Sequence, residues 1–195
     1  VQAFWRLRPL KFMVSMGERY KADPRSLTEY KRTDMRRGYA IDSEKLVKAM
    51  ADQTRAYRAM IEFFRDWDVL ITPGWATLPL TLAEIERREA AMKAANEARG
   101  PFEHDFSVSD PSRTINPPIT LTHHPVLTMP AGRGPTGQPF AFNLIGPYRG
   151  DARLIAAARA LEPIFADDAE LARPLPDLAR IASWAAGPRP QLAGA

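Results

Sequence analysis

The sequence TLTHHPVLTMPAG at residues 120–132, followed by GQPFAFNLIGP at residues 137–147, decides the fold of this chain. Both stretches are short and apolar, which is typical of β-strands that are buried on both faces. The first stretch ends in Pro-Ala-Gly and the second ends in Gly-Pro, with a short Gly/Pro-rich loop between them. Such turn residues either fix φ or allow it to be positive. The pattern therefore predicts two strands, Val126–Met129 and Phe140–Ile145, joined by a turn.

These two stretches resemble the C-terminal part of the amidase signature family, which are serine hydrolases that cleave carboxamides. Family members usually read Asn-Leu-Thr-Gly-x-Pro-Ala-x-x-x-Pro-Ala-Gly and then Gly-x-Pro-x-Gly-x-Gln-x-x-Gly. The positions that match in register are Pro125, Pro130, Ala131, Gly132, Gly137, Pro139 and Gly146. The positions that depart are Thr120 in place of Asn, His123 in place of Gly, Ala141 in place of Gly and Asn143 in place of Gln.

The resemblance extends on both sides, over roughly residues 36 to 165. The sequence FFRDWDVLITP at 63–73 is similar to the family's helix end running into an Asp-Val-Leu-Leu-Thr-Pro strand, and residues 150–162 are similar to its final helix. The implied fold class is α/β: the C-terminal part of the amidase-signature fold, a mixed β-sheet covered by helices on both faces. We expect residues 1–185 to be this portion of an amidase domain, not a complete catalytic domain, and residues 186–195 to be a flexible tail.

Helical periodicity and end signals predict the other elements. Helices are expected over 2–20, from Asp23-Pro24, over 43–66 with Asp42 as N-cap, from the capping box at Thr81–Glu84 to Arg99, over 152–165 with Asp151 as N-cap, and near 177–184. A buried strand is expected at 68–72. The prolines between 100 and 119 predict an irregular connection there, and an ordered loop of this length often borders a pocket.

Composition excludes several classes of protein. The 195 residues are 45% hydrophobic and 26% charged, with a net charge of +4. Basic residues are interleaved with acidic ones along most of the chain, so we expect no nucleic-acid partner. There is no cysteine, which excludes disulfides, thiolate nucleophiles and Cys-ligated metals. No apolar run is long enough for a membrane span. We expect a cytoplasmic protein, although the start at Val1 suggests a processed or excerpted chain that could have lost a signal.

The three histidines are His104, His123 and His124, and their spacing gives little support for a separate site. His123 and His124 are adjacent, and neighbouring residues on a strand point to opposite faces, so we expect no metal. His104 lies between Glu103 and Asp105, a weak ligand set. A triad of Ser107, His104 and Asp110 stays open, but no nucleophile elbow supports it.

The family's catalytic unit is a serine nucleophile, a second serine with a cis peptide bond, and a lysine base. The seven serines of this chain are Ser15, Ser26, Ser43, Ser107, Ser109, Ser112 and Ser183, and none follows the Gly-Ser-Ser pattern. The resemblance therefore carries over no catalytic residue. It implies that the partner is the N-terminal catalytic half of the amidase, cleaved or separately encoded, and that no cofactor is needed.

Four residues are candidates for binding a small-molecule amide. Trp75 follows a predicted strand, and ligands collect at the C-terminal ends of strands in α/β sheets. His123 places a bulky, titratable ring where the family has glycine, so we expect this ring to protrude into the pocket. Thr120 and Asn143 occupy two other positions that depart from the family pattern, and the resemblance implies that they lie at the substrate pocket. The function expected is hydrolysis of a carboxylic amide. The alternatives are an amidase-derived binding or scaffold module, and the amidase-like subunit of a tRNA-dependent amidotransferase.

Overall fold

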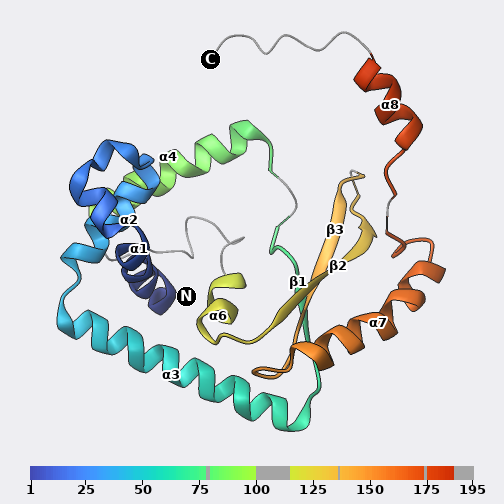
Figure 1. Ribbon diagram of the computed structural model, residues 1–195, viewed down its shortest axis with the longest axis horizontal. Coiled ribbons are helices and arrows are strands. Elements are labelled where there is room, and N and C mark those ends of the chain that lie inside the picture. The colour runs from blue at the N-terminus through green and yellow to red at the C-terminus, as the bar shows by residue number, and fades with distance from the viewer. Residues whose placement is uncertain (78–79, 100–114, 136, 174, 187–195) are drawn as a thin grey trace.

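The computed structural model describes residues 1–77, 80–99, 115–135, 137–173 and 175–186 (Figure 1). The helices are α1 (Gln2–Ala22), the 3-10 helix η1 (Pro24–Ser26), α2 (Glu29–Ala40), α3 (Ser43–Asp66), α4 (Leu82–Arg99), α6 (Asn116–Leu121), α7 (Asp151–Asp167) and α8 (Leu178–Ala186). The strands are β1 (Leu70–Pro73), β2 (Val126–Arg133) and β3 (Pro139–Ile145). Helices α1 and α2 gather at one end, and the long helix α3 runs from them to the sheet.

The three strands form an antiparallel sheet in the order β1-β3-β2. The central strand β3 is buried from Phe142 to Ile145, as predicted. The edge strands β1 and β2 instead alternate between exposed and less exposed residues, so the prediction of burial on both faces is wrong for them. The physical reason is that neighbouring strand residues point to opposite faces of the sheet. In β2, Leu127 and Met129 pack with the core beneath α7, whereas Val126 and Thr128 on the other face remain exposed.

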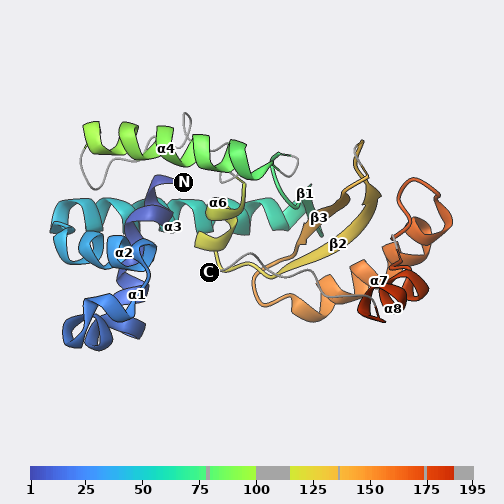
Figure 2. The ribbon, with the colours of Figure 1, turned by 90° about the horizontal axis from the view of Figure 1, so that it is seen from above.

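Two small hydrophobic cores hold the structure together. Helix α7 packs on the sheet, where Leu154 and Ala158 meet the strand residues Met129, Phe142 and Leu144. Figures 1 and 2 both show α7 running alongside the strands. The second core lies at the helical end and joins α1, α3 and α6 through buried residues: Ala3, Ala49 and Leu121. Because α6 leads directly into β2, the two cores are connected through the segment that decides the fold.

Hydrogen bonds at the helix ends confirm two of the predicted caps. The Asp42 carboxylate accepts from the backbone N–H of Lys45 at 2.7 Å, which confirms the cap of α3. The Thr81 backbone N–H donates to Glu84, and the Glu84 N–H donates to the Thr81 hydroxyl, which confirms the capping box of α4. At α7 the prediction was wrong by one position: Gly150 is the N-cap, and Asp151 is the first helical residue.

The helix predicted from Asp23-Pro24 begins later than expected. Asp23 and Pro24 start only the short η1 turn, and Leu27 is extended, with φ −108° and ψ 149°. Thr28 then caps α2 by accepting from the Lys31 N–H at 3.4 Å. The Asp23 carboxylate accepts a hydrogen bond from the Arg25 N–H, which stabilises this short turn in place of the first turn of an α-helix.

Helix α6 contradicts the irregular connection predicted up to residue 119. It begins at Asn116, and Pro117 and Pro118 occupy its first turn. Proline is tolerated there because the first N–H groups of a helix have no intrahelical partner. Residues 100–114 and the predicted tail beyond residue 186 lie outside the described residues.

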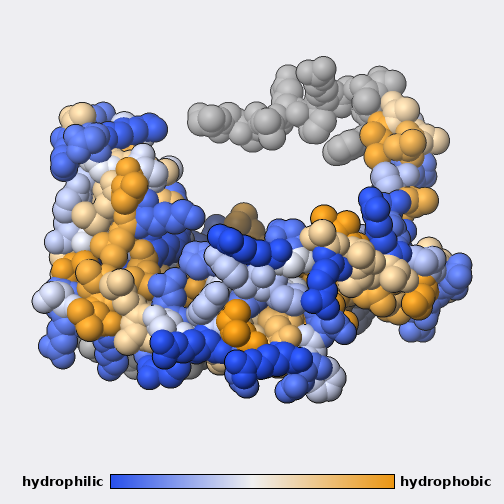
Figure 3. Space-filling model, turned by 60° about the horizontal axis from the view of Figure 1, so that its bottom comes forward, coloured by the Kyte–Doolittle hydropathy of each residue, from blue (hydrophilic) through white to orange (hydrophobic). Residues whose placement is uncertain are grey.

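Large apolar side chains are exposed on several elements of the molecule, and Figure 3 shows separate orange areas on the face that it presents. They belong to α1, α3, β1, α4, α7 and α8 and to the segment before α8: Val14, Val47, Ile71, Leu82, Ile164, Leu175 and Leu178 are each more than half exposed. Exposed apolar residues are ordinary singly, but this many on so small a chain leave large areas that association would bury.

Candidate substrate-binding site

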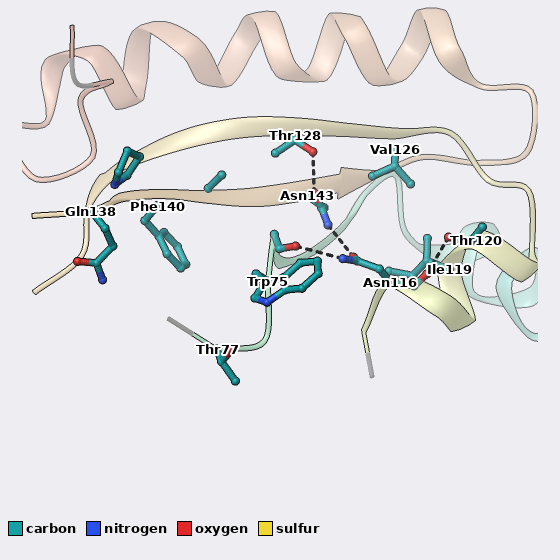
Figure 4. Close-up of a pocket in the computed structure, with 13 residues that line it drawn as sticks. Trp75, Thr77, Asn116, Ile119, Thr120, Val126, Thr128, Gln138, Phe140 and Asn143 are labelled. Atoms are coloured by element: carbon teal, nitrogen blue, oxygen red, sulfur yellow. Dashed lines mark hydrogen bonds between the residues drawn. The ribbon is translucent and has the colours of Figure 1, made fainter. Parts of the chain in front are cut away.

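A cavity of about 670 Å³ lies beside the sheet, at the end of β1. Its walls come from the turn after β1, from α6 and from strands β2 and β3, as Figure 4 shows. The described residues that line it are Gly74, Trp75, Thr77, Asn116, Ile119, Thr120, Val126, Thr128, Gln138, Pro139, Phe140, Ala141 and Asn143. Segments far apart in sequence therefore meet at one concave site.

A chain of hydrogen bonds crosses the inner wall of this cavity (Figure 4). The Thr128 hydroxyl donates to Asn143 Oδ1 at 2.8 Å, and Asn143 Nδ2 donates to Asn116 Oδ1 at 3.3 Å. Asn116 Nδ2 in turn donates to the backbone carbonyl of Gly74 at 3.3 Å. We call these four residues the amide relay. It joins β2, β3, α6 and the turn after β1, and each of its amide groups both accepts and donates.

The position of Asn143 follows from the register of the sheet. Asn143 lies opposite Thr72 on β1 and opposite Thr128 on β2, so it occupies the middle of the three strands. Its side chain is only 6% exposed. A buried amide without partners would be costly, and the relay supplies one donor and one acceptor for it.

Gly74 directs the chain from β1 into the cavity. Its N–H donates to the Ala141 carbonyl at 2.9 Å, and a Cβ atom at this position would lie 2.9 Å from the same oxygen. Only glycine therefore lets the turn approach β3 so closely. The next residue, Trp75, stands in Figure 4 between Phe140 and Asn116. The backbone thus delivers an indole ring to the mouth of the cavity.

Apolar side chains form most of the lining. Trp75 is 52% exposed and Phe140 is 39% exposed, and Val126 and Ile119 add aliphatic surface. None of the described lining residues carries a charge at neutral pH. Ligand sites usually combine an apolar lining with a few well-placed polar groups. Here those groups are amides and hydroxyls.

Three of the four predicted site residues line this cavity. Trp75, Thr120 and Asn143 are brought together, with the Thr120 hydroxyl donating to the Asn116 carbonyl at 2.9 Å. The fourth, His123, is not among the described lining residues. Its Nε2 lies 3.4 Å from Gln53 Nε2 on α3. The binding roles of all four stay predictions.

The backbone explains the unusual position of His123. Its φ is +55°, in the left-handed region that favours glycine. Position 123 lies in the turn between α6 and β2, which requires a positive φ, and this explains why the family pattern has Gly there. Histidine is among the residues enriched in this conformation, so the substitution keeps the turn.

Sequence reasoning missed Asn116, Thr128 and Gly74. Asn116 was hidden in the proline-rich connection, although Asn directly before Pro-Pro is a signal for the start of a helix. In the sequence, Thr128 lies within an apolar run, so its polar role was not predicted. The polar residue at alternate spacing within β2 was the available signal, since neighbouring strand residues face opposite sides.

His124 lies in a second, enclosed environment. It is 6% exposed, and its ring contacts Tyr57, Phe64 and Tyr148 at centroid distances of 5.9, 5.3 and 6.1 Å. Nδ1 lies 3.0 Å from the Thr122 carbonyl, which can only accept, so Nδ1 carries the proton. The buried Nε2 has no hydrogen-bond partner among the described residues. Burial lowers the pKa of His124, partly offset by the Thr122 carbonyl.

Within the described part of the chain, no group of three or more potential metal ligands comes together. His104, its acidic neighbours, and Ser107 and Asp110 of the open triad lie outside the described residues. Among the residues that the structure describes, no helix is both long enough and apolar enough to cross a membrane.

The fold and the cavity define an α/β protein in which helices pack on a small antiparallel sheet. The chain belongs to the amidase family, whose model matches residues 15–155. This confirms the family and the fold class that the sequence resemblance implied. Comparison with curated protein sequences gives no match.

Solved structures of amidases are similar in fold. An amidase superposes with a TM-score of 0.61 at 17% identity, over 83% of this chain and 34% of that chain. A bacterial aryl acylamidase of the amidase signature family gives 0.61 at 20% identity, over 83% and 32%. Allophanate hydrolase from Kluyveromyces lactis gives 0.57 at 18% identity, over 87% and 27%. The chain thus spans about a third of the length of the first of these relatives, and still less of the third.

Proposed function

We propose that this chain is the C-terminal portion of an amidase that hydrolyses a carboxylic, non-peptide amide. The observation that carries the proposal is the cavity at the end of β1, within the matched region 15–155. Its lining of apolar side chains and amides suits an organic amide. In this proposal Trp75, Thr120 and Asn143 form one wall of the substrate pocket.

The chemistry would be acyl transfer through residues outside this chain. In the family, a lysine acting through a second serine removes the proton from the nucleophilic serine, which attacks the amide carbon. The amine then leaves with a proton, and water hydrolyses the acyl-serine ester. A hydroxyl needs such a base to become a nucleophile, and the developing oxyanion needs backbone N–H donors. A lysine–serine relay handles these proton transfers, so the proposal includes no cofactor.

The contribution of this chain would be positioning. The amide relay fixes the turn that carries Trp75, and the wall holds the substrate while the reacting carbonyl faces the catalytic half. Correct placement of reacting groups is worth several kcal/mol of the barrier, of order 7–11 in the best cases. A wall that holds no nucleophile can therefore still determine the rate.

The proposed partner is the N-terminal catalytic half of the same amidase. We call the complex of this half with the present chain the assembly. Strands β1 and β2 each have one neighbour among the described residues, and unpaired strand edges are normally covered. The exposed apolar residues and the two small cores also favour a large contact. We expect an effectively obligate interface of more than roughly 2,000 Å².

A scaffold module remains the second candidate. It is favoured by the four departures at positions 120, 123, 141 and 143 from the family pattern. A subunit of a tRNA-dependent amidotransferase is a third candidate, for which the family pattern gives less support. Both candidates predict no amide hydrolysis by the assembly in the absence of other proteins and tRNA.

The test compares the isolated 195-residue chain with the assembly. Both are incubated with simple aryl and alkyl amides, and amine release is measured. The proposal expects release by the assembly and none by the isolated chain. Absence of release by an intact assembly, shown by light scattering to contain both halves, would favour the scaffold reading.

A further inference from the structure

We infer that the cavity binds the uncharged, aromatic part of the substrate, with the amide relay setting this preference. The inference rests on the proposed amidase function and narrows it to a substrate class. Three observations carry it: the absence of charge from the described lining, the pair of aromatic rings at the mouth, and the unused N–H groups of the relay.

The lining argues against a charged substrate group. Its described polar groups are the side chains of Thr77, Asn116, Thr120, Thr128, Gln138 and Asn143, none of which is ionised. A carboxylate or ammonium that enters a site of lowered dielectric loses hydration, and without a counter-charge this loss is not repaid. A neutral group loses far less. The described wall therefore selects against ions of either sign.

The size and shape of the wall favour a ring. Trp75 and Phe140 both expose aromatic surface to the cavity, on the same side of the sheet (Figure 4). Aromatic rings pack on one another in offset or edge-to-face arrangements that add to simple area burial. The volume of about 670 Å³ exceeds what a small aliphatic amide would fill. An aryl group would bury both rings.

The relay leaves donors for a neutral acceptor. Each asparagine amide has two N–H groups, and Asn143 and Asn116 each use one of them in the relay. The second N–H of each has no acceptor among the described residues and can donate to a neutral oxygen of the substrate. Asn116 has a further role as a positioning residue, because its other N–H holds the Gly74 carbonyl and hence the turn that carries Trp75.

The experiment uses the assembly and a matched set of amides of one acid. The amines are 4-methylaniline, 4-aminobenzoate, 4-(trimethylammonio)aniline and 4-methylcyclohexylamine, so that charge and aromaticity change separately. We expect kcat/KM for the neutral anilide to exceed that for each of the other three by at least tenfold. Equal or higher kcat/KM for the carboxylate, the cation or the cyclohexyl amide would overturn the inference.

Variants of residues that line the cavity test whether these residues cause the substrate preference. Trp75→Ala should raise KM for the neutral anilide at least fivefold, whereas Trp67→Ala, which removes an exposed tryptophan outside the cavity lining, should not. Asn116→Asp places a negative charge in the wall and should shift selectivity toward the cationic anilide. If Asn116 has only a structural role, Asn116→Asp should change kcat/KM for all four substrates by the same factor. That result would show that Asn116 does not determine selectivity.

Failure of the inference and failure of the proposed function can be told apart. If the assembly hydrolyses amides but prefers charged ones, the function stands and the inference is wrong. If it hydrolyses none, the function is wrong, and binding of the same four amides, measured by isothermal titration calorimetry, then decides the inference. Binding of the neutral anilide that is lost in Trp75→Ala supports it, and equal binding of all four contradicts it.

Discussion

The side-chain amide of Asn143 donates from Nδ2 to Oδ1 of Asn116 over 3.3 Å, and this contact joins the central strand to helix α6. It closes the inner wall of the cavity across 27 residues of sequence. Because Asn116 then holds the Gly74 carbonyl, the geometry of three segments depends on two neutral amides. Stability and substrate binding should therefore respond together when either amide is removed.

The first prediction concerns the relay. Asn143→Ala should lower the free energy of unfolding of the assembly by about 1–3 kcal/mol, because it leaves the Thr128 hydroxyl and Asn116 Oδ1 without partners. Denaturant unfolding measures the change. Thr120→Ala is the control, since Thr120 is exposed and donates only to a carbonyl of its own helix, and it should change stability by less than about 0.5 kcal/mol. Equal losses for both variants would contradict the relay.

The second prediction concerns Gly132, in the Pro-Ala-Gly segment that the structure places within strand β2. Gly132 has φ +75°, and a Cβ atom there would overlap the Glu170 carbonyl oxygen in the segment after α7. Gly132→Ala should therefore destabilise the fold by more than the roughly 1–2 kcal/mol that a left-handed conformation costs alone. Gly137→Ala is a matched control, because Gly137 has φ +81° and a Cβ would meet nothing within 4 Å. Thermal unfolding compares them, and an equal cost for both would show that the close approach to Glu170 is unimportant.

The third prediction is a pH dependence of stability. Burial lowers the pKa of His124 below its unfolded value of about 6.5. The unfolded chain then takes up a proton before the folded chain does. Stability should be fully present above about pH 6.5 and should fall as the pH decreases through that value toward the lowered folded-state pKa. Unfolding midpoints between pH 5 and pH 8 measure this effect.

Two variants test whether His124 is the group responsible for the pH dependence of stability. His124→Phe keeps a ring among Tyr57, Phe64 and Tyr148 but cannot titrate, so the slope between pH 5 and 6.5 should flatten. His123→Asn removes the exposed neighbouring histidine and should leave the slope in place. The opposite pattern would show that His124 is not the group responsible.

The fourth prediction concerns the turn at His123. His123→Val should cost about 1–2 kcal/mol, because a β-branched residue is poorly accommodated at φ +55°. His123→Gly should restore the family residue with little change in stability. Substrate kinetics provide the second readout: an unchanged KM in His123→Gly would place His123 outside the substrate pocket, and a changed KM would support its predicted binding role.

Much of the fold could be predicted because its determinants are local. The capping residues Asp42 and Thr81 act within three residues of their own positions, and the central strand β3 is apolar except for Asn143. The start of α2 could not be predicted from Asp23-Pro24, because the same residues also form a short turn. Exposure of the edge strands depends on which of their faces is packed in the folded chain, and the apolar composition of these strands does not encode this.

The candidate site was only partly predictable for the same reason. Trp75 follows a strand end and Asn143 departs from a family pattern, so both were visible in the sequence. Asn116 becomes important only because α6 brings it within 3.3 Å of Asn143. Contacts of this kind arise from tertiary packing. His123 was assigned by the size of its ring, whereas its backbone angle was the stronger constraint.

The measurement that tests the central claim most directly is labelling of the assembly with a serine-reactive phosphonate, followed by mass spectrometry of its peptides. We predict stoichiometric labelling of one serine in the N-terminal catalytic half, with loss of amide hydrolysis, and no label on this chain. Stoichiometric labelling of any of its seven serines, accompanied by the same loss of activity, would contradict the account.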